Sequence, residues 1–146
     1  MRIRALALIA GAVATCAACS SEPKAAPLPD GVLAAGTAQI TVDGRDGGTT
    51  HEVRCSSMGF QTAITTGNAT SGTTALVSGG DELTAESVGI RDLAGFTGNY
   101  NASLGEATAE VTMAGPTFVI SGTATGFRTD AASFTTDGKF TLRVSC

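Results

Sequence analysis

The chain ends in the stretch Lys139-Phe140-Thr141-Leu142-Arg143-Val144-Ser145-Cys146, and this stretch decides the fold. Its Phe, Leu, Val and Cys side chains alternate strictly with Lys, Thr, Arg and Ser. Successive side chains of a β-strand point to opposite faces of the sheet, so the pattern predicts a strand with one buried face.

The same alternation recurs earlier in the chain. Between residues 106 and 113, small and apolar side chains at the odd positions, from Ala107 to Met113, alternate with Glu and Thr at the even positions, from Glu106 to Thr112. A second alternating stretch, from Phe118 to Ala124, follows a turn at Gly115-Pro116. Weaker strand patterns lie at residues 60–66, 73–78, 83–91 and 95–104. Near the start, residues 39–43 and 51–56 flank Gly44-Arg45-Asp46-Gly47-Gly48, which predicts a hairpin with a turn at 44–48.

The composition agrees with many short strands. The 146 residues include 19 Gly and 22 Thr, no Trp, and only 5% aromatic residues. Thr suits a pleated sheet and Gly breaks helices. No amphipathic helix pattern follows residue 36, and Asp81 to Glu86 has room for one helical turn at most. We expect a mainly β protein: an antiparallel β-sandwich or partly open barrel of about eight strands, preceded by a signal helix and a disordered tether.

The N-terminus has the pattern of an export signal. Arg2 and Arg4 precede an uncharged run from Ala5 to Ala18, which is too short to span a bilayer as a helix. The run ends in Cys16-Ala17-Ala18-Cys19, which resembles the bacterial lipobox, where small residues precede a Cys that receives a diacylglyceryl group. We expect residues 1–18 to be the lipoprotein signal peptide and Cys19 the acylated N-terminus. The alternatives are acylation of Cys16, or ordinary secretion or a retained helix.

Two further regions follow the signal. Residues 19–36 carry three of the four prolines and no apolar period, so we expect a flexible tether of about 50 Å when fully extended. Residues 37–146 form the β domain. The mature chain keeps 7 Lys and Arg against 13 Asp and Glu, a net charge of −6. With no basic cluster after residue 4, nucleic-acid binding and polybasic membrane docking are not expected.

Cysteine usage predicts one disulfide. Cys16 leaves with the signal and Cys19 is acylated, so Cys55 and Cys146 remain. An even remainder in an exported domain favours a bond between them. Cys55 shares a strand face with Val53, and Cys146 shares one with Val144, so we expect both to meet in the core.

Groups suited to catalysis or metal binding are sparse. His51 is the only His, and it has Asp43, Asp46 and Glu52 nearby but no further His or free Cys to complete a zinc site. No Ser stands in a Gly-x-Ser-x-Gly elbow. The stretch Asp43 to Gly47 lacks the alternating acids of a calcium loop and is interpreted as a turn. We expect no enzyme, no metal and no cofactor.

Two features keep other functions open. Asp81, Glu82 and Glu86 form a carboxylate group that a hydrolase could use, although a solvated acidic loop is the ordinary interpretation. The expected inward positions Ala107, Ala109, Gly122 and Ala124 are small. Small inward side chains let sheets approach closely, or they leave an apolar pocket for a lipid tail. The alternative function is therefore a carrier of a lipid or glycolipid.

The chain resembles one known family over nearly all of residues 37–146. The stretches that carry the likeness are Cys19, Val42-Asp43-Gly44, Val53-Arg54-Cys55, Ser87-Val88-Gly89-Ile90, Ile120-Ser121-Gly122-Thr123-Ala124-Thr125-Gly126 and the ending from Phe140 to Cys146. They are similar to the mycobacterial 19-kDa lipoprotein antigen (LpqH) family.

The resemblance implies a non-catalytic surface antigen, lipid-anchored on the outer face of the bacterial cell membrane. In that family the acyl chains are recognised by host Toll-like receptor 2, and the proteins act as antigens and adhesins. The implied partners are the membrane, a host receptor, and envelope lipids or glycans. The family tether is rich in Ser and Thr and is O-mannosylated, whereas residues 20–36 contain only Ser20 and Ser21. Glycosylation of this tether is therefore not expected.

Overall fold

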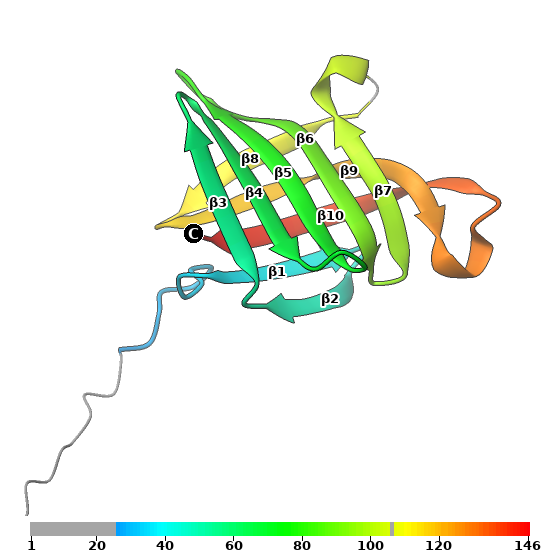
Figure 1. The fold of residues 1–146 in the computed structure, drawn as a ribbon, viewed down its shortest axis with the longest axis horizontal. Coiled ribbons are helices and arrows are strands. Elements are labelled where there is room, and N and C mark those ends of the chain that lie inside the picture. Colours follow the sequence, from blue (N-terminus) through cyan, green and yellow to red (C-terminus); the bar gives the residue numbers. More distant parts are fainter. Residues whose placement is uncertain (1–25, 106) are drawn as a thin grey trace, which may run out of the picture.

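The computed structural model describes residues 26–105 and 107–146 (Figure 1). The signal peptide, Cys16 and Cys19 lie outside the described residues. Ten strands account for most of the described chain: β1 Thr37–Val42, β2 Arg45–Thr50, β3 Val53–Met58, β4 Gln61–Gly67, β5 Gly72–Gly79, β6 Leu83–Leu93, β7 Phe96–Asn101, β8 Ala109–Ala114, β9 Thr117–Arg128 and β10 Thr135–Ser145. Two 3₁₀ turns, η1 Ala102–Leu104 and η2 Thr129–Ala131, complete the described elements, and no helix there is long and apolar enough to cross a membrane.

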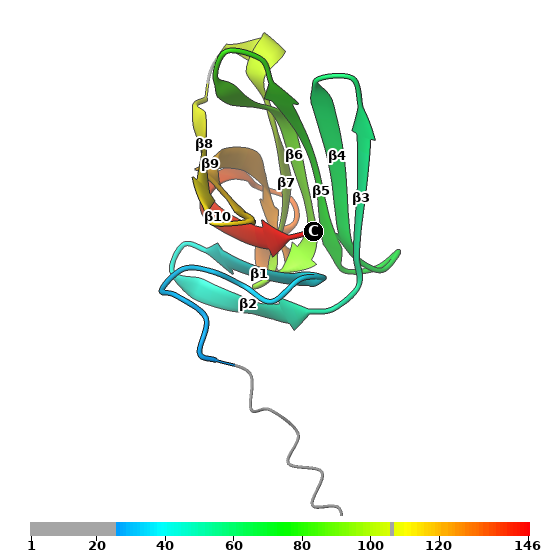
Figure 2. The ribbon, with the colours of Figure 1, turned by 90° about the vertical axis from the view of Figure 1, so that its left-hand side faces the viewer.

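All strand pairs are antiparallel and belong to one continuous sheet. Its order is β2-β1-β10-β9-β7-β6-β5-β4-β3, with β8 added on β9. The long strand β9 makes this possible, because Thr117 to Gly122 pair with β8 while Thr125 to Arg128 pair with β7. Figure 2 shows the result: β3 to β7 form one wall, β8 to β10 the opposite wall, and β1 and β2 lie beneath. The expected antiparallel, partly open barrel is confirmed, with ten strands where about eight were expected.

The C-terminal stretch forms the strand that its alternation predicted. In β10, Phe140, Leu142 and Val144 are each at most 2% exposed, whereas Lys139 and Arg143 face solvent. β10 lies between β1 and β9, so these side chains occupy the middle of the core. The other fully buried large side chains come from both walls and from β1: Val42, Ile64, Val77, Val88, Ile90, Phe96 and Ile120.

The bulkiest of these, Phe96, is accommodated by glycines. A Cβ added to Gly138 would stand 2.9 Å from two atoms of the Phe96 ring, and one added to Gly98 would stand 2.6 Å away. The ring thus occupies the space that side chains at these two positions would need. Arg128 covers the ring, with its guanidinium carbon 5.6 Å from the ring centre, in a cation–π contact.

The N-terminal hairpin differs from the expectation in its turn and its partner strand. β1 turns at Asp43-Gly44, where both residues have positive φ (49° and 74°), the geometry of a two-residue hairpin turn. The stretch Arg45–Thr50, expected to be mostly turn, is strand β2, so the prediction of a turn over 44–48 is wrong. Residues 51–56 do not pair with β1; β3 pairs with β4 instead.

Glycines explain why the sequence pattern does not predict β2. The register between β1 and β2 shifts by one residue opposite Ile40, where Gly47 and Gly48 form a bulge. Gly48 has φ +92°, and a Cβ on Gly47 would stand 2.7 Å from the Ile40 side chain. Such a strand shows no alternation, because its geometry requires glycines where alternation would require side chains.

The segment before β1 contacts the domain over its last residues. The Leu33 N–H donates to Thr117 Oγ1 at 2.9 Å, and the Gly36 N–H donates to the Ser145 carbonyl at 2.8 Å. Val32 and Leu33 are half-buried, whereas residues 26–30 are exposed. Within the segment expected to be tether, residues 32–36 therefore lie on the domain.

Candidate functional site: the disulfide margin and the His51 recess

Cys55 and Cys146 are joined by a disulfide, with their Cα atoms 6.0 Å apart. The bond connects β3, at one end of the strand order, to the residue that follows β10 in the opposite wall. The predicted pairing of the two cysteines is confirmed, and the bond ties the free edge of β3 to the end of the central strand β10.

The place of the bond differs from the expectation. Cys55 lies opposite Ile64 in the β3–β4 register, so it is on the inner face of the sheet, where Ile64 is only 1% exposed. Yet Cys55 and Cys146 are both exposed residues. The predicted inner-face position of the cysteines is correct, but their predicted burial in the core is wrong, because the barrel is open beside β3 and no described strand covers the bridge.

A recess of about 430 Å³ lies at this open side of the barrel, between the β1–β2 hairpin and the turn that joins β4 to β5. Buried side chains of the core, Ala38, Ile40 and Leu142, line it. Gly47 and Gly67 expose backbone in its walls. This volume is in the range of small-molecule sites.

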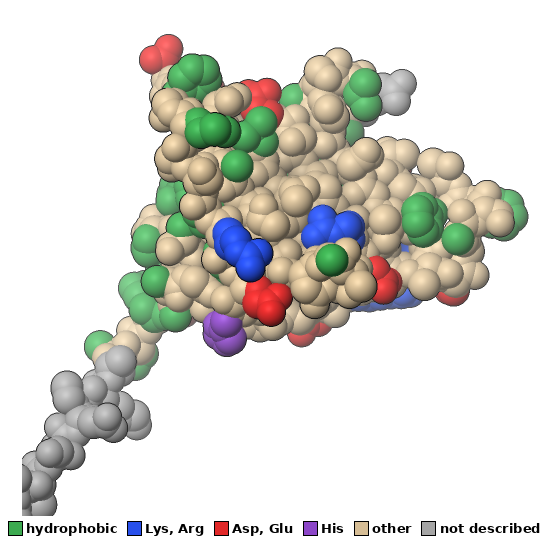
Figure 3. Space-filling model, in the orientation of Figure 1, with side chains coloured by type: hydrophobic (Ala, Val, Ile, Leu, Met, Phe, Trp, Pro, Cys, Tyr) green, Lys and Arg blue, Asp and Glu red, His purple; other side chains and the backbone are tan. Residues whose placement is uncertain are grey.

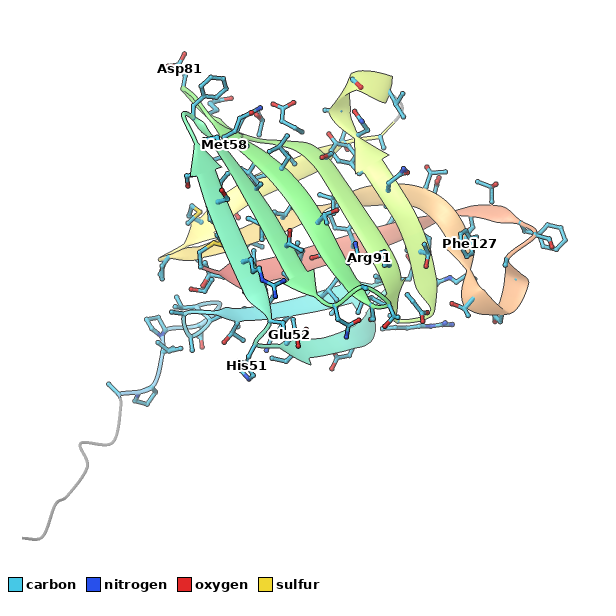
Figure 4. The ribbon with its side chains drawn as sticks, viewed as in Figure 1. His51, Glu52, Met58, Asp81, Arg91 and Phe127 are labelled. Atoms are coloured by element: carbon cyan, nitrogen blue, oxygen red, sulfur yellow. A yellow bond between two sulfur atoms is a disulfide. The ribbon has the colours of Figure 1, made fainter. Side chains whose placement is uncertain are left out.

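The rim of the recess is polar. His51 and Glu52 project from the segment between β2 and β3, as Figure 4 shows, and both are exposed. His51 Nδ1 lies 3.2 Å from Thr37 Oγ1, and the neighbouring Asn68 side chain is engaged by its own turn, accepting from Thr70 and Ser71 N–H groups. In the space-filling view His51 stands at the lower edge of the molecule, with acidic and basic groups above it (Figure 3).

Two of the three acids near His51 in the sequence, Asp43 and Asp46, are engaged elsewhere. Asp43 Oδ1 accepts from the Lys139 N–H at 2.8 Å, and its other oxygen pairs with Arg128. Asp46 Oδ1 accepts from the Gly48 N–H at 2.7 Å within the bulge. These contacts fix the turn and the bulge of the hairpin, as turn chemistry predicts.

The described residues bring no set of metal-ligating side chains together. No cluster of three or more His, Cys, Asp or Glu side chains occurs among them. Asp81 and Glu82 lie in the exposed β5–β6 turn, at the end of the molecule away from His51 (Figure 4). Glu106 is outside the described residues. His51 therefore has one carboxylate beside it, Glu52, in an open setting.

The small inward residues favour close packing at the positions described. A Cβ on Gly122 would stand 2.7 Å from the Ala109 Cβ, so β8 and β9 approach closely there. Ala124 is completely buried in the core. The His51 recess lies elsewhere, at the open side of the barrel. Sequence patterns do not predict this recess, because its walls come together only when the sheet curls.

Together these features define a class: small antiparallel β domains stabilised by a disulfide, the kind of domain that oxidising compartments outside the cytoplasm maintain. The sequence model of the family described as "Mycobacterium 19 kDa lipoprotein antigen" matches residues 31–146, and the chain belongs to this family.

Individual relatives agree with this membership. The chain is 37% identical to a protein of Mycobacterium indicus pranii named "Putative lipoprotein", with all of both chains covered. It is 35% identical to a protein of the same name from Mycobacterium avium subsp. hominissuis, covering all of this chain and 97% of the relative. It is 29% identical to "Lipoprotein LpqH" of Mycobacterium tuberculosis H37Rv over 77% of this chain and 71% of the relative.

Proposed function

We propose that this lipoprotein acts on the host through its acyl chains and the surface of its β domain, not through catalysis. Membership of a family of lipoprotein antigens is the observation that carries the proposal. Cys19, which follows lipobox-like residues, is the acceptor for the acyl chains. Two or three chains on one residue hold a protein stably in a bilayer, and one does not.

Two separate contacts follow from this proposal. The acyl chains are the agonist that Toll-like receptor 2 recognises, and the domain is the part that acts as adhesin. The exposed faces of the domain suit contact with another protein or with glycans, because they carry many Thr side chains and few charges. The domain itself contributes little to receptor activation.

A reporter cell line that expresses Toll-like receptor 2 tests the proposal. The exported protein is compared with the Cys19→Ala variant, and with protein treated to remove its ester-linked acyl chains. Both changes should abolish the signal while the domain keeps its circular dichroism spectrum. A variant or deacylated protein that signals as strongly as the parent contradicts the role of the acyl chains.

A lipid or glycolipid carrier is the second candidate. The His51 recess favours it, because Ala38, Ile40 and Leu142 give its floor an apolar character. Native mass spectrometry of the protein purified from its own envelope distinguishes the two candidates. A lipid that travels with the domain, and is lost when Gly47→Val fills part of the recess in protein that keeps its circular dichroism spectrum, supports the carrier. Protein free of non-covalent lipid supports the surface antigen alone.

A further inference from the structure

We propose that the outer edge of β3 is a docking site for an extended segment of another protein, which adds to the sheet as a further strand. This inference goes beyond the host contact proposed above and does not depend on acylation. It rests on the hydrogen-bonding groups of β3, on the disulfide that holds this strand, and on the contrast with the other end of the sheet.

The β3 strand contributes almost nothing to the core. Val53 is half-buried, and the five residues from Arg54 to Met58 are all exposed. Its neighbour β4 places Ile64 and Thr66 in the interior. Despite this, β3 carries the cysteine that is cross-linked to the end of the central strand β10. The disulfide therefore holds in place a strand whose own side chains supply little reason for it to stay.

The free edge of β3 presents a regular set of backbone donors and acceptors. The Gly67 N–H donates to the Glu52 carbonyl at 2.9 Å, in the same register that pairs Val53 with Thr66. In an antiparallel pair the bonding direction alternates from one residue to the next. Glu52, Arg54 and Ser56 thus bond toward β4, and the N–H and C=O groups of Val53, Cys55 and Ser57 point outward. Among the described hydrogen bonds, none uses these outward groups.

The two ends of the strand order differ in how they are protected. The β2 edge has a glycine bulge and carries Arg45 and Asp46, features that discourage pairing with another chain. β3 pairs with β4 without any register shift, contains no Pro or Gly, and has Arg54 as its one charged residue. Figure 2 shows β3 as the outermost strand of its wall. An unprotected, regular edge is the template that an added strand requires.

The chemistry of the partner follows from the side chains beside this edge. On the inner face an added strand would lie next to Val53 and the Cys55–Cys146 bridge, which suits small or apolar residues. On the outer face it would lie next to Arg54, which suits a carboxylate. The partner is therefore an extended segment of about five residues that alternates apolar with polar side chains and carries Asp or Glu on its polar side.

A second copy of this chain fits the edge less well. Using all six outward groups in a two-fold antiparallel pair would place Cys55 opposite its own counterpart. The two disulfides would then meet at the same point on the inner face. A segment from a different protein has no such conflict, so we expect the protein itself to remain monomeric.

The test uses the exported full-length protein in detergent micelles and a capped synthetic peptide, acetyl-TVEVTVT-amide. Amide resonances of β3 are followed by NMR during titration. We expect saturable shifts centred on Val53, Cys55 and Ser57, with slower hydrogen exchange at these amides. Ser57→Pro, which removes one outward N–H without removing a bond to β4, should weaken binding at least tenfold. The matched control Ser57→Ala should bind within twofold of the parent.

Two further binding measurements test the proposal even if the Ser57→Pro variant fails to fold. The same peptide N-methylated at alternate residues on its bonding edge should not bind the parent protein, and Arg54→Glu should weaken binding of the unmodified peptide several-fold. Absence of saturable shifts in the parent, equal binding of the N-methylated peptide, or shifts confined to another strand would overturn the proposal. So would a dimer in sedimentation that Ser57→Pro dissociates, because the occupant would then be a second copy. An acylated parent protein that fails to activate the receptor while its β3 edge still binds the peptide would refute only the host proposal.

Discussion

Removal of the disulfide is the perturbation whose magnitude the structure defines best. In the double variant Cys55→Ala, Cys146→Ala, the cross-link between residues 91 positions apart is lost. The chain-entropy model assigns such a loop about 4–5 kcal/mol. Because both cysteines are exposed, the substitutions leave no cavity in the core, and the loss measures the cross-link itself. Domains of this size unfold with about 5–15 kcal/mol, so the expected loss is a large fraction of the total.

The assay is reversible unfolding in guanidinium chloride and by heat, for the parent and the double variant. We expect the melting temperature to fall by about 15–20 °C, since 1 kcal/mol corresponds to roughly 4 °C for a domain of about 110 residues. Ser56→Ala, on the same exposed strand, serves as the control and should change stability by less than about 0.5 kcal/mol. A double variant within about 1 kcal/mol of the parent would refute the reasoning, because β3 would then be held without its bridge.

Three further substitutions test separate parts of the fold. Phe96→Ala empties the space beside Gly98 and Gly138 and should cost about 3–5 kcal/mol, measured by guanidinium unfolding; a cost below about 1 kcal/mol would mean that the ring is not a core element. Asp43→Ala removes the acceptor for the Lys139 N–H and the partner of Arg128, so we expect the free energy of unfolding, measured by thermal unfolding, to fall by about 1–2 kcal/mol. Asp43→Asn should lose about half of that, because Asn keeps an acceptor oxygen and tolerates positive φ. His51→Ala should change stability by less than about 0.5 kcal/mol in the same assay, because His51 is exposed; a larger loss would show that its contact with Thr37 matters to the fold.

Much of the barrel could be predicted from the sequence, because most strands have one buried face. Where a strand separates core from solvent, alternation marks it, as in β10 with Phe140, Leu142 and Val144 inside. β2 has no such division, since no residue of this strand is buried and two glycines form its bulge. β2 forms because of the Asp43-Gly44 turn and because it pairs with β1. The residue pattern of one strand taken alone contains no information on such pairing.

The candidate site was predicted only in part, for a related reason. The even number of remaining cysteines and their position on the apolar strand face identified the Cys55–Cys146 pair. The exposure of the pair could not be predicted, because it depends on the barrel being open beside β3. The His51 recess joins residues from the β1–β2 hairpin to the β4–β5 turn, and their proximity comes from the curl of the sheet. The prediction of a lipobox at Cys19 is of another kind, since an export signal is a property of the local sequence and not of the folded domain. That prediction needs a measurement on the exported chain.

Mass spectrometry of the N-terminal peptide from the exported protein tests the central claim most directly. We expect a peptide that begins at Cys19 and carries a diacylglyceryl group on its sulfur. The control peptide containing Cys55 and Cys146 should appear as one disulfide-linked species without acyl mass. An N-terminal peptide that begins elsewhere, or that contains Cys19 unmodified, would contradict an account in which this lipoprotein is held and recognised through its acyl chains.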